Sequence, residues 1–215
     1  MLAPAVAEWR WVGDRALLRT FDGEIADANR TALACGRAVT AVASSAVEDV
    51  VPGARSLLVI LRPGAEPPSA VTELLEHESW SADNVEGRTL EIPVRYGGYD
   101  GPDLASVARV AGLTEEAVVR AHSAPVYVVG FIGFSPGFPY LLGMNERLAT
   151  PRLDSPRPRV EPGSVGIGGA YTGVYPRATA GGWRLIGRTD VELFDPDRRP
   201  PSLLKPGDRV RFVRR

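Results

Sequence analysis

The chain has 215 residues, of which 44% are hydrophobic and 24% are charged, an ordinary globular composition with room for one large domain or two small ones. Its 25 Lys and Arg nearly balance 26 Asp and Glu, so no overall positive field favours nucleic acid or an anionic membrane. The single cysteine, Cys35, excludes an internal disulfide and a multi-cysteine metal site. The single cysteine also favours the reducing cytoplasm, and the absence of a basic segment before an apolar run at the N-terminus predicts an unprocessed protein. With two histidines and no cysteine cluster, we expect no metal site.

Residues 1–86 predict a small α+β domain. Extended segments at Glu8–Val12 and Ala16–Phe21 precede a helix over residues 24–43, whose apolar positions recur at steps of three and four and place Cys35 in the core. The next elements are a hairpin of Val47–Val51 and Ser56–Leu61 around a Pro-Gly turn, a helix over Val71–Glu76 and a strand over Thr89–Val94. The order strand, helix, strand, strand, helix, strand is typical of a ferredoxin-like split βαβ arrangement.

Residues 87–215 predict a second domain, with the boundary near residues 83–88, where Ser81–Asn84 is polar. Two short helices come first, Asp103–Ala111 ended by Gly112 and a second capped by Thr114 and reaching His122. Short apolar runs broken by Gly and Pro then favour a β-barrel or sandwich. These runs are Val126–Phe131, Ser164–Ile167, Arg184–Ile186, Val191–Phe194 and Arg209–Val213.

The stretch Gly133–Gly137 matches the G-x-S-x-G pattern of a hydrolase nucleophile elbow, but the chemistry argues against Ser135 as a nucleophile. The elbow needs a backbone N–H on the residue after the serine, and Pro136 has none. The elbow fold also places its histidine after the serine, whereas His77 and His122 both precede it. We therefore interpret the match as coincidental.

Three other features are candidate binding or catalytic groups. Gly166, Gly168 and Gly169, with Thr172 beside them, either leave backbone amides open to a ligand or simply mark strand ends. A proline-rich stretch carries three arginines, suited to carboxylates or phosphates unless they are merely solvated. They are Arg152, Arg157 and Arg159. His122 ends a helix, where it either caps the carbonyls or acts as a general acid or base.

From Ile92 onward a set of motifs occurs in one order and carries a specific resemblance. The motifs are IPVRYGG, GPDLASVARVAGLTEEAVVRAH, GFSPGFPYLLG, ATPRLDSPRPRVEPGSVGIGG, TGVYP, GGWRLIGRT and LLKPGDRVRF. The chain resembles the B subunit of bacterial 5-oxoprolinase, a family also named allophanate hydrolase subunit 1 that includes Kip-type inhibitors of a sporulation histidine kinase. The resemblance implies a ferredoxin-like domain over residues 1–86 and a cyclophilin-like barrel over residues 87–215.

The resemblance also implies a heteromeric enzyme that opens the 5-oxoproline lactam to glutamate, together with subunits C and A. ATP and its Mg²⁺ would drive the reaction, bound by the complex and not necessarily by this chain, which would be inactive alone. Related domain pairs form the carboxyltransferase part of urea carboxylase. The alternatives are a protein that inhibits a histidine kinase and a subunit that processes allophanate or urea.

The resemblance assigns a pocket to the loops. One wall would contain Phe134, Pro136, Gly137, Phe138 and Tyr140. Arg152, Arg157 and Arg159 would hold a substrate carboxylate or phosphate, and Gly168, Gly169, Tyr171 and Thr172 would supply backbone donors beside Tyr175, Trp183 and Arg188. His122 and Arg157 are the catalytic candidates. Members of the family commonly read GGQTG where residues 169–173 of this chain read GAYTG, so Tyr171 stands in place of the glutamine. They read VPAGS where residues 160–164 read VEPGS, with Glu161 as the added charge. The loss of the glutamine amide removes a polar group that could bind the substrate, which puts the identity of the substrate in doubt.

Overall fold

The computed structural model describes residues 9–43, 45–77, 80 and 87–215, which form two compact units, Met1–Glu86 and Gly87–Arg215. The polar segment Ser81–Asn84, where the boundary is predicted, lies outside the described residues. Within the described ranges, no helix is both long enough and apolar enough to cross a membrane.

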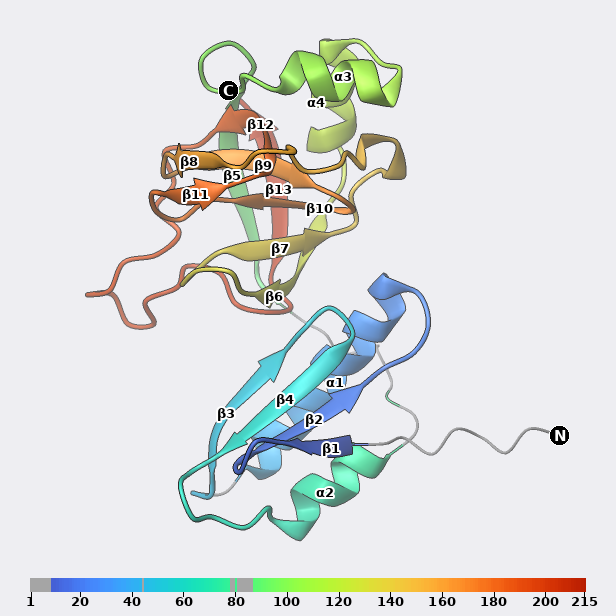
Figure 1. The fold of residues 1–215 in the computed structure, drawn as a ribbon, viewed down its shortest axis with the longest axis vertical. Coiled ribbons are helices and arrows are strands. Elements are labelled where there is room, and N and C mark those ends of the chain that lie inside the picture. Colours follow the sequence, from blue (N-terminus) through green and yellow to red (C-terminus); the bar gives the residue numbers. More distant parts are fainter. Residues whose placement is uncertain (1–8, 44, 78–79, 81–86) are drawn as a thin grey trace, which may run out of the picture. The chain divides into compact units, whose positions relative to one another are not determined.

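The first unit is a four-stranded antiparallel sheet with the strand order β1-β2-β4-β3. Its elements are β1 (Trp9–Val12), β2 (Ala16–Thr20), α1 (Ile25–Val42), β3 (Val47–Pro52), β4 (Ser56–Leu61) and α2 (Ser69–Glu76). Because β2 and β3 each pair antiparallel with β4, they run in the same direction, and α1 connects them with β4 inserted between. This is the predicted split βαβ arrangement (Figure 1).

The helices cover one face of this sheet, and the hydrophobic pattern explains why. Along β4, Leu57, Val59 and Leu61 alternate with less buried residues and are fully buried, so they lie on the helix side. The stripe predicted for α1 packs against them, and Cys35 is fully buried as expected. The two ends of the stripe are exceptions, because Ile25 is only partly buried and Val42 is 44% exposed.

The prediction from the order of elements assigned one strand to the wrong sheet. The segment predicted as Thr89–Val94 is β5 (Thr89–Tyr96), and it belongs to the barrel of the second unit. The edge of the first sheet beside β2 is instead filled by β1, which forms a separate antiparallel hairpin with β2. An alternating apolar run predicts a strand but does not identify its partner, and this explains the error.

The second unit is built on a closed barrel with the strand order β10-β7-β6-β13-β5-β12-β9. The strands that follow β5 are β6 (Tyr127–Ile132), β7 (Pro139–Leu142), β9 (Ser164–Gly168), β10 (Tyr171–Val174), β12 (Arg184–Arg188) and β13 (Arg209–Arg214). A two-stranded sheet joins β8 (Arg157–Val160) to β11 (Thr179–Gly181). The α+β class with a separate barrel is confirmed.

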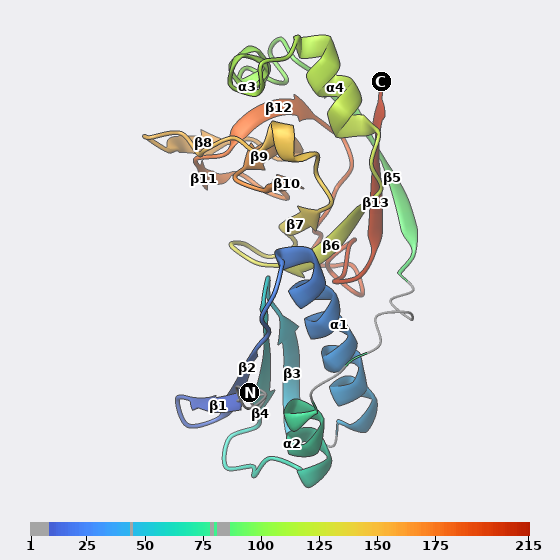
Figure 2. The same ribbon diagram turned by 90° about the vertical axis from the view of Figure 1, so that its right-hand side faces the viewer.

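Helices α3 (Leu104–Ala111) and α4 (Glu115–Ser123) lie together at one end of the barrel in both ribbon views (Figures 1 and 2). Gly112 ends α3 with a φ of 63°, and the Thr114 side chain accepts a hydrogen bond from the Ala117 N–H at 3.2 Å, so both predicted caps are confirmed. A short 3-10 helix, Glu146–Leu148, packs against both helices.

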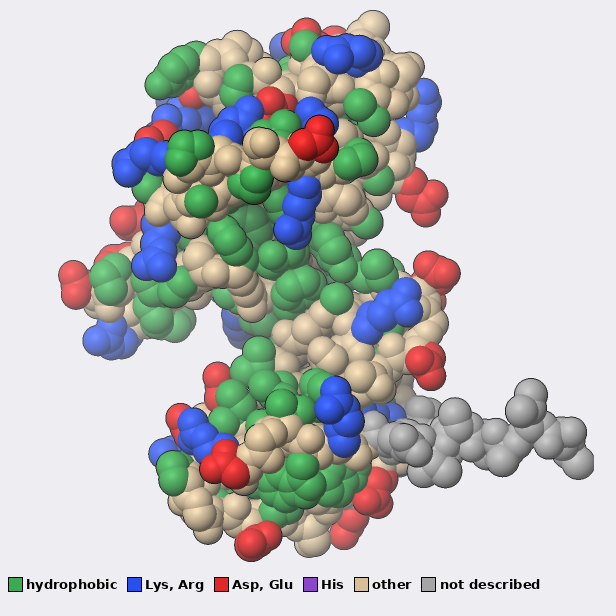
Figure 3. All heavy atoms as spheres, viewed as in Figure 1, with side chains coloured by type: hydrophobic (Ala, Val, Ile, Leu, Met, Phe, Trp, Pro, Cys, Tyr) green, Lys and Arg blue, Asp and Glu red, His purple; other side chains and the backbone are tan. Residues whose placement is uncertain are grey.

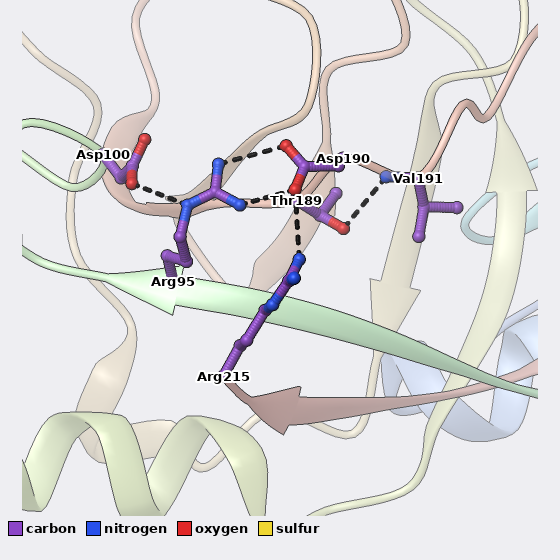
Figure 4. A network of polar contacts seen from close by, with 6 residues as sticks. All are labelled: Arg95, Asp100, Thr189, Asp190, Val191 and Arg215. Atoms are coloured by element: carbon purple, nitrogen blue, oxygen red, sulfur yellow. Dashed lines mark hydrogen bonds and ion pairs between the residues drawn. The ribbon is translucent and has the colours of Figure 1, made fainter.

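The seam between β5 and β12 carries an ion-pair network that includes Arg215 (Figure 4). The Arg95 guanidinium contacts both carboxylate oxygens of Asp190, at 2.6 and 3.1 Å, and its Nε donates to Asp100 at 3.0 Å. Arg215 reaches the same Asp190 carboxylate at 3.3 Å. Hydrogen bonding from Arg95 holds the pKa of Asp190 below its usual value. The network therefore joins β5 to the segments after β12 and β13.

The barrel strands are only partly those predicted. The runs at residues 126–131, 164–167, 184–186 and 209–213 correspond to β6, β9, β12 and β13, but Val191–Phe194 is not a strand and only Phe194 forms an isolated bridge, with Ser202. Strands β7, β8, β10 and β11 were missed. Each has only three or four residues and contains Pro or Gly, which are depleted in strands generally.

Candidate functional site

The loop between β6 and β7 is stiff and partly strained. The Ser135 N–H donates to the Gly133 carbonyl at 2.7 Å, and Phe134 between them has a φ of 64°, which is the rarer, strained form of γ-turn. The Phe138 N–H then donates to the Ser135 carbonyl at 3.0 Å, with Pro136 second and Gly137 third in the turn at a φ of 78°. That pattern is a type II turn. The loop holds the Phe134 ring 60% exposed.

Beside this loop the second unit has a small aromatic pocket of about 50 Å³. It is lined by Phe134, Phe138, Tyr140, Arg152, Tyr175, Gly181, Gly182 and Trp183. The rings pack mainly edge to face, with the centroids of Phe138 and Trp183 5.1 Å apart and those of Phe138 and Tyr175 5.0 Å apart. Hydrophobic side chains gather on this face of the barrel in Figure 3. Phe134, Phe138 and Tyr140, which the resemblance assigned to one wall, lie together here, and their role in binding stays a prediction.

The strand glycines next to the pocket make room for the indole of Trp183. A Cβ on Gly168 would lie 2.5 Å from the indole Nε1, and a Cβ on Gly166 would lie 3.2 Å from the Trp183 Cβ. Gly173 on β10 faces the same ring, with a built Cβ 3.2 Å from it. Gly166 and Gly168 are two apart on β9 and so lie on one face. Packing accounts for these glycines without a bound ligand.

Several predicted ligand groups are used within the protein. The Gly169 N–H donates to the Thr150 carbonyl at 2.9 Å, so this donor is not free. Tyr171 and Thr172 are strand residues, and the fully buried Thr172 hydroxyl donates to the Gly166 carbonyl at 3.0 Å. Gly137 packs against Phe194, only 2.7 Å from a built Cβ. The Gly169 N–H and the Thr172 hydroxyl are therefore both used within the protein.

Arg157 is held next to the pocket by a buried carboxylate. Its Nη2 donates to Asp103 Oδ1 at 2.8 Å, while Asp103 Oδ2 accepts the Leu185 backbone N–H at 2.7 Å. The Asp103 N–H donates in return to the Leu185 carbonyl at 2.9 Å. This reciprocal pair ties the start of α3 to β12 and fixes Arg157. Arg157 Nη1 is buried and has no hydrogen-bond partner.

Arg152 brings a second positive charge to the pocket. It lines the pocket directly, and among the described residues no ion pair involves it. Burial raises the pKa of Tyr175, and this rise is opposed by a backbone hydrogen bond from Trp183 and by the charges of Arg152 and Arg157. The Tyr175 phenol thus lies within electrostatic range of two guanidinium groups, whose positive charge suits a small anion.

Two predicted arginines lie elsewhere. Arg159, 67% exposed, pairs with Glu161 at 2.6 Å, which gives the unusual Glu161 a local partner. Arg188 lines a different pocket, of about 370 Å³, together with Pro162, Gly163 and Asp190. Pro136 is exposed in the turn but does not line the aromatic pocket. The structure therefore separates Arg159 and Arg188 from the predicted site.

His122 is not placed for catalysis at this pocket. Its side chain is fully buried and stacks on Phe212 with a centroid distance of 4.6 Å. Because the Thr172 hydroxyl donates to Gly166, it accepts from His122 Nε2 at 2.8 Å, and Nδ1 accepts from the Tyr96 hydroxyl at 2.8 Å. Burial lowers its pKa to about 3, so the ring is neutral and the expected charged helix cap is wrong.

No base among the described residues serves Ser135 either. Its Oγ has no hydrogen-bond partner, and both ring nitrogens of His122 are occupied as described. The other histidine, His77, lies in the first unit at the end of α2, where its ring contacts Trp80 edge to face. These contacts agree with the interpretation that the elbow motif is coincidental.

Sequence reasoning missed Asp103, Gly181 and Gly182. Asp103 was assigned only to a helix start, and nothing in the sequence pairs it with Arg157, 54 residues away. Gly181 carried a usable signal, because it directly precedes Gly182 and Trp183, and adjacent glycines before a large aromatic residue indicate close packing. A Cβ on Gly181 would lie 2.4 Å from the Tyr175 hydroxyl oxygen.

Comparison with known proteins gives the relationships of the chain. Residues 7–204 match the family described as carboxyltransferase domain, subdomain C and D. The chain is 53% identical to the 5-oxoprolinase B subunit of Escherichia coli O157:H7 over 172 residues, 78% of each sequence. It belongs to the family of 5-oxoprolinase B subunits. It is also 55% identical to the Bacillus subtilis protein of the same name over 130 residues, which cover 60% of this chain and 54% of that protein.

Solved structures share the fold. A crystal structure of TTHA0988 is 38% identical with a TM-score of 0.81, covering 94% of this chain but only 40% of that longer one. An uncharacterized Pyrococcus horikoshii protein, PH0987, is 41% identical over 97% of both chains with a TM-score of 0.59. The urea amidolyase of K. lactis, at 20% identity and a TM-score of 0.71, matches over 15% of its length and supports the fold alone.

Proposed function

We propose that this chain is the B subunit of an ATP-dependent 5-oxoprolinase, which opens the 5-oxoproline lactam to L-glutamate together with subunits C and A. The observation that carries the proposal is the 53% identity to a 5-oxoprolinase B subunit across 78% of both sequences. Named subunits of this kind act in a complex, so the chain is proposed to be inactive alone. The substrate, partners and chemistry are all part of the proposal.

The aromatic pocket supports binding of a small anionic cyclic amide. Arg152, which lines the pocket, would hold the carboxylate of 5-oxoproline, with the charge of Arg157 nearby, since guanidinium groups match carboxylates in geometry and charge. The flat lactam ring would lie against Tyr140 and Trp183. A pocket of about 50 Å³ is small for a complete substrate site, which suits a wall that a second subunit completes.

ATP, with its Mg²⁺, would supply the phosphoryl group that activates the amide oxygen for ring opening. The chain lacks the Gly-rich Lys-Ser/Thr phosphate loop, and Gly168 and Gly169 are committed to Trp183 packing and to Thr150, respectively. The predicted glycine turn therefore does not fit a phosphate cradle. In this proposal, the aromatic pocket positions the substrate and Arg157 neutralises its carboxylate.

Reconstitution tests the proposed function. Purified subunits A, B and C should release glutamate and ADP from 5-oxoproline and ATP, and omission of this chain should abolish both products. Glutamate release that does not depend on this chain would contradict the proposal. Replacing 5-oxoproline by allophanate or urea in the same assay separates the amide substrates by their ATP turnover.

Kinase inhibition is tested separately, because it needs no small substrate. Titrating the chain into an autophosphorylating histidine kinase should leave the kinase rate unchanged if the chain is only an oxoprolinase subunit. Stoichiometric inhibition would favour the regulatory alternative. No feature among the described residues favours that alternative over the enzyme subunit.

A further inference from the structure

A second, larger pocket in the barrel unit is strongly basic. Its volume is about 450 Å³, and it is formed by Arg88 at the start of the unit and by the loop before β13. It is lined by Arg88, Arg198, Arg199, Pro200, Ser202, Leu203 and Lys205. None of these residues lines the aromatic pocket. Four of the seven lining side chains are cationic, a density that a solvated surface loop does not require.

Backbone carbonyls hold these guanidinium groups in place. Arg198 Nη2 donates to the carbonyls of Leu193 and Pro201, at 3.3 and 2.9 Å. Arg88 Nη2 donates to the Leu203 carbonyl, and Arg199 Nη1 donates to two carbonyls of its own loop. Neutral acceptors fix the arginines without cancelling their charge. Each guanidinium has five N–H donors, so every one of the three retains donors for a ligand.

Carboxylates neutralise little of this charge. Asp208 is fully buried and contacts Arg88 Nε at 3.4 Å, while its Oδ2 also accepts the Lys205 backbone N–H at 3.1 Å. Asp195 and Asp197 belong to the same loop but are not among the lining residues. Arg198 Nε is buried without a hydrogen-bond partner. The pocket thus has an excess of positive charge and a buried donor that no protein group satisfies.

We propose that this basic pocket binds a polyphosphate chain, either that of a nucleoside triphosphate or a free inorganic polyphosphate. Three fixed guanidinium forks and one ammonium match several anionic groups in a row, whereas a single carboxylate would leave most of these donors unpaired. The volume of about 450 Å³ lies within the range of small-molecule sites. Pro200 and Leu203 provide the apolar part of the lining.

Binding to the isolated chain tests this site. Titration calorimetry with inorganic tripolyphosphate should show saturable binding, weakened at least about tenfold in the double variant Arg199→Glu, Lys205→Glu. Both residues are exposed, so their replacement leaves the core intact. Arg109→Glu is the matched control, because this arginine is exposed on α3 and distant in sequence from the pocket lining. The Arg109→Glu variant should bind tripolyphosphate as tightly as the unmodified chain does. Circular dichroism confirms folding, and Lys205→Ala replaces the double variant if that variant unfolds.

Three outcomes would overturn the site: no saturable binding, an equal loss in Arg109→Glu, or citrate binding as tightly as tripolyphosphate. A parallel titration with ATP identifies the source. Binding of ATP with the same sensitivity to the double variant supports a nucleotide, and binding of tripolyphosphate alone supports free polyphosphate. The site goes beyond the proposed function and does not depend on it, because no outcome requires turnover of 5-oxoproline.

Discussion

His122 and Arg157 are both polar side chains of the barrel unit, and the sequence made both of them catalytic candidates. The His122 ring is fully buried, and both of its nitrogens have partners in Tyr96 and Thr172. Arg157 is 28% exposed and bound to Asp103, but one of its terminal nitrogens has no partner. The difference shows that a buried ring with a complete set of internal partners marks a structural residue, whereas Arg157 is anchored by one carboxylate and keeps part of its side chain exposed.

The largest effect is expected from removing the His122 ring. His122→Ala should lower the free energy of unfolding by about 3–5 kcal/mol, since it opens a cavity beside Phe212 and leaves the partly buried Tyr96 hydroxyl without its acceptor. Urea denaturation of both proteins measures the change. The chain's other histidine provides the control: His77→Ala, at an exposed position, should change the value by less than about 0.5 kcal/mol. Equal effects would remove the distinction drawn for His122.

The stability of the chain at low pH should also reflect the burial of His122. The pKa of His122 is about 3 in the folded chain against an ordinary 6.5, so below pH 6.5 the unfolded state binds a proton that the folded state does not. The contribution of the neutral His122 ring to the free energy of unfolding is therefore intact above pH 6.5. It is lost as the pH falls towards 3, at about 1.4 kcal/mol per pH unit. Stability curves of the chain and of His122→Gln should converge as the pH falls. Parallel curves would show that His122 does not titrate in this way.

A smaller effect is expected from Arg157, and it should appear in activity. Arg157→Ala should reduce turnover of 5-oxoproline by the reconstituted complex about 10- to 100-fold, because one charge-assisted contact to the substrate is lost. The neighbouring Arg159→Ala is the matched control, since Arg159 is exposed and pairs only with Glu161. Size-exclusion chromatography verifies that both variants assemble. If Arg159→Ala impairs turnover as much as Arg157→Ala, the assignment of Arg157 fails.

The smallest effect is expected at Ser135. Ser135→Ala should change turnover by less than about twofold, because the hydroxyl has no hydrogen-bond partner and no base beside it among the described residues. Steady-state kinetics of the assembled complex measure the change. A loss of more than about a hundredfold would restore Ser135 as a nucleophile and contradict the interpretation of the loop.

Sequence reasoning was most successful where structure is local. The Gly112 and Thr114 caps and the hairpin of β3 and β4 follow from patterns within about twenty residues and are confirmed, as is the α1 stripe from Ala28 to Val39. The assignment of β5 to the first sheet failed because strand pairing is decided by distant segments. Strands β7 and β10 were missed because each has only four residues, one of them Pro or Gly, which is too short for an alternating pattern to appear.

The candidate site was predictable in its residue types but not in its distances. Phe134, Tyr140, Arg152, Tyr175 and Trp183 do line one pocket, as the resemblance implied. Arg159 and Arg188 share the same chemistry but lie elsewhere, because the path of each strand, which the sequence does not give, decides where its side chains end. The spacing of Gly166 and Gly168 suggested open amides, and only the position of Trp183 shows that these glycines accommodate a ring.

The parallel pairing of β5 with β13 has a consequence for synthesis of the protein. These are the first and last strands of the barrel, and they pair over six positions from Thr89 with Arg209 to Val94 with Arg214. During translation the cylinder stays open, with β5 and β6 lacking the neighbour that β13 provides, until this last strand leaves the ribosome. The barrel can therefore close only after β13, the last of its strands in the sequence, has been synthesised.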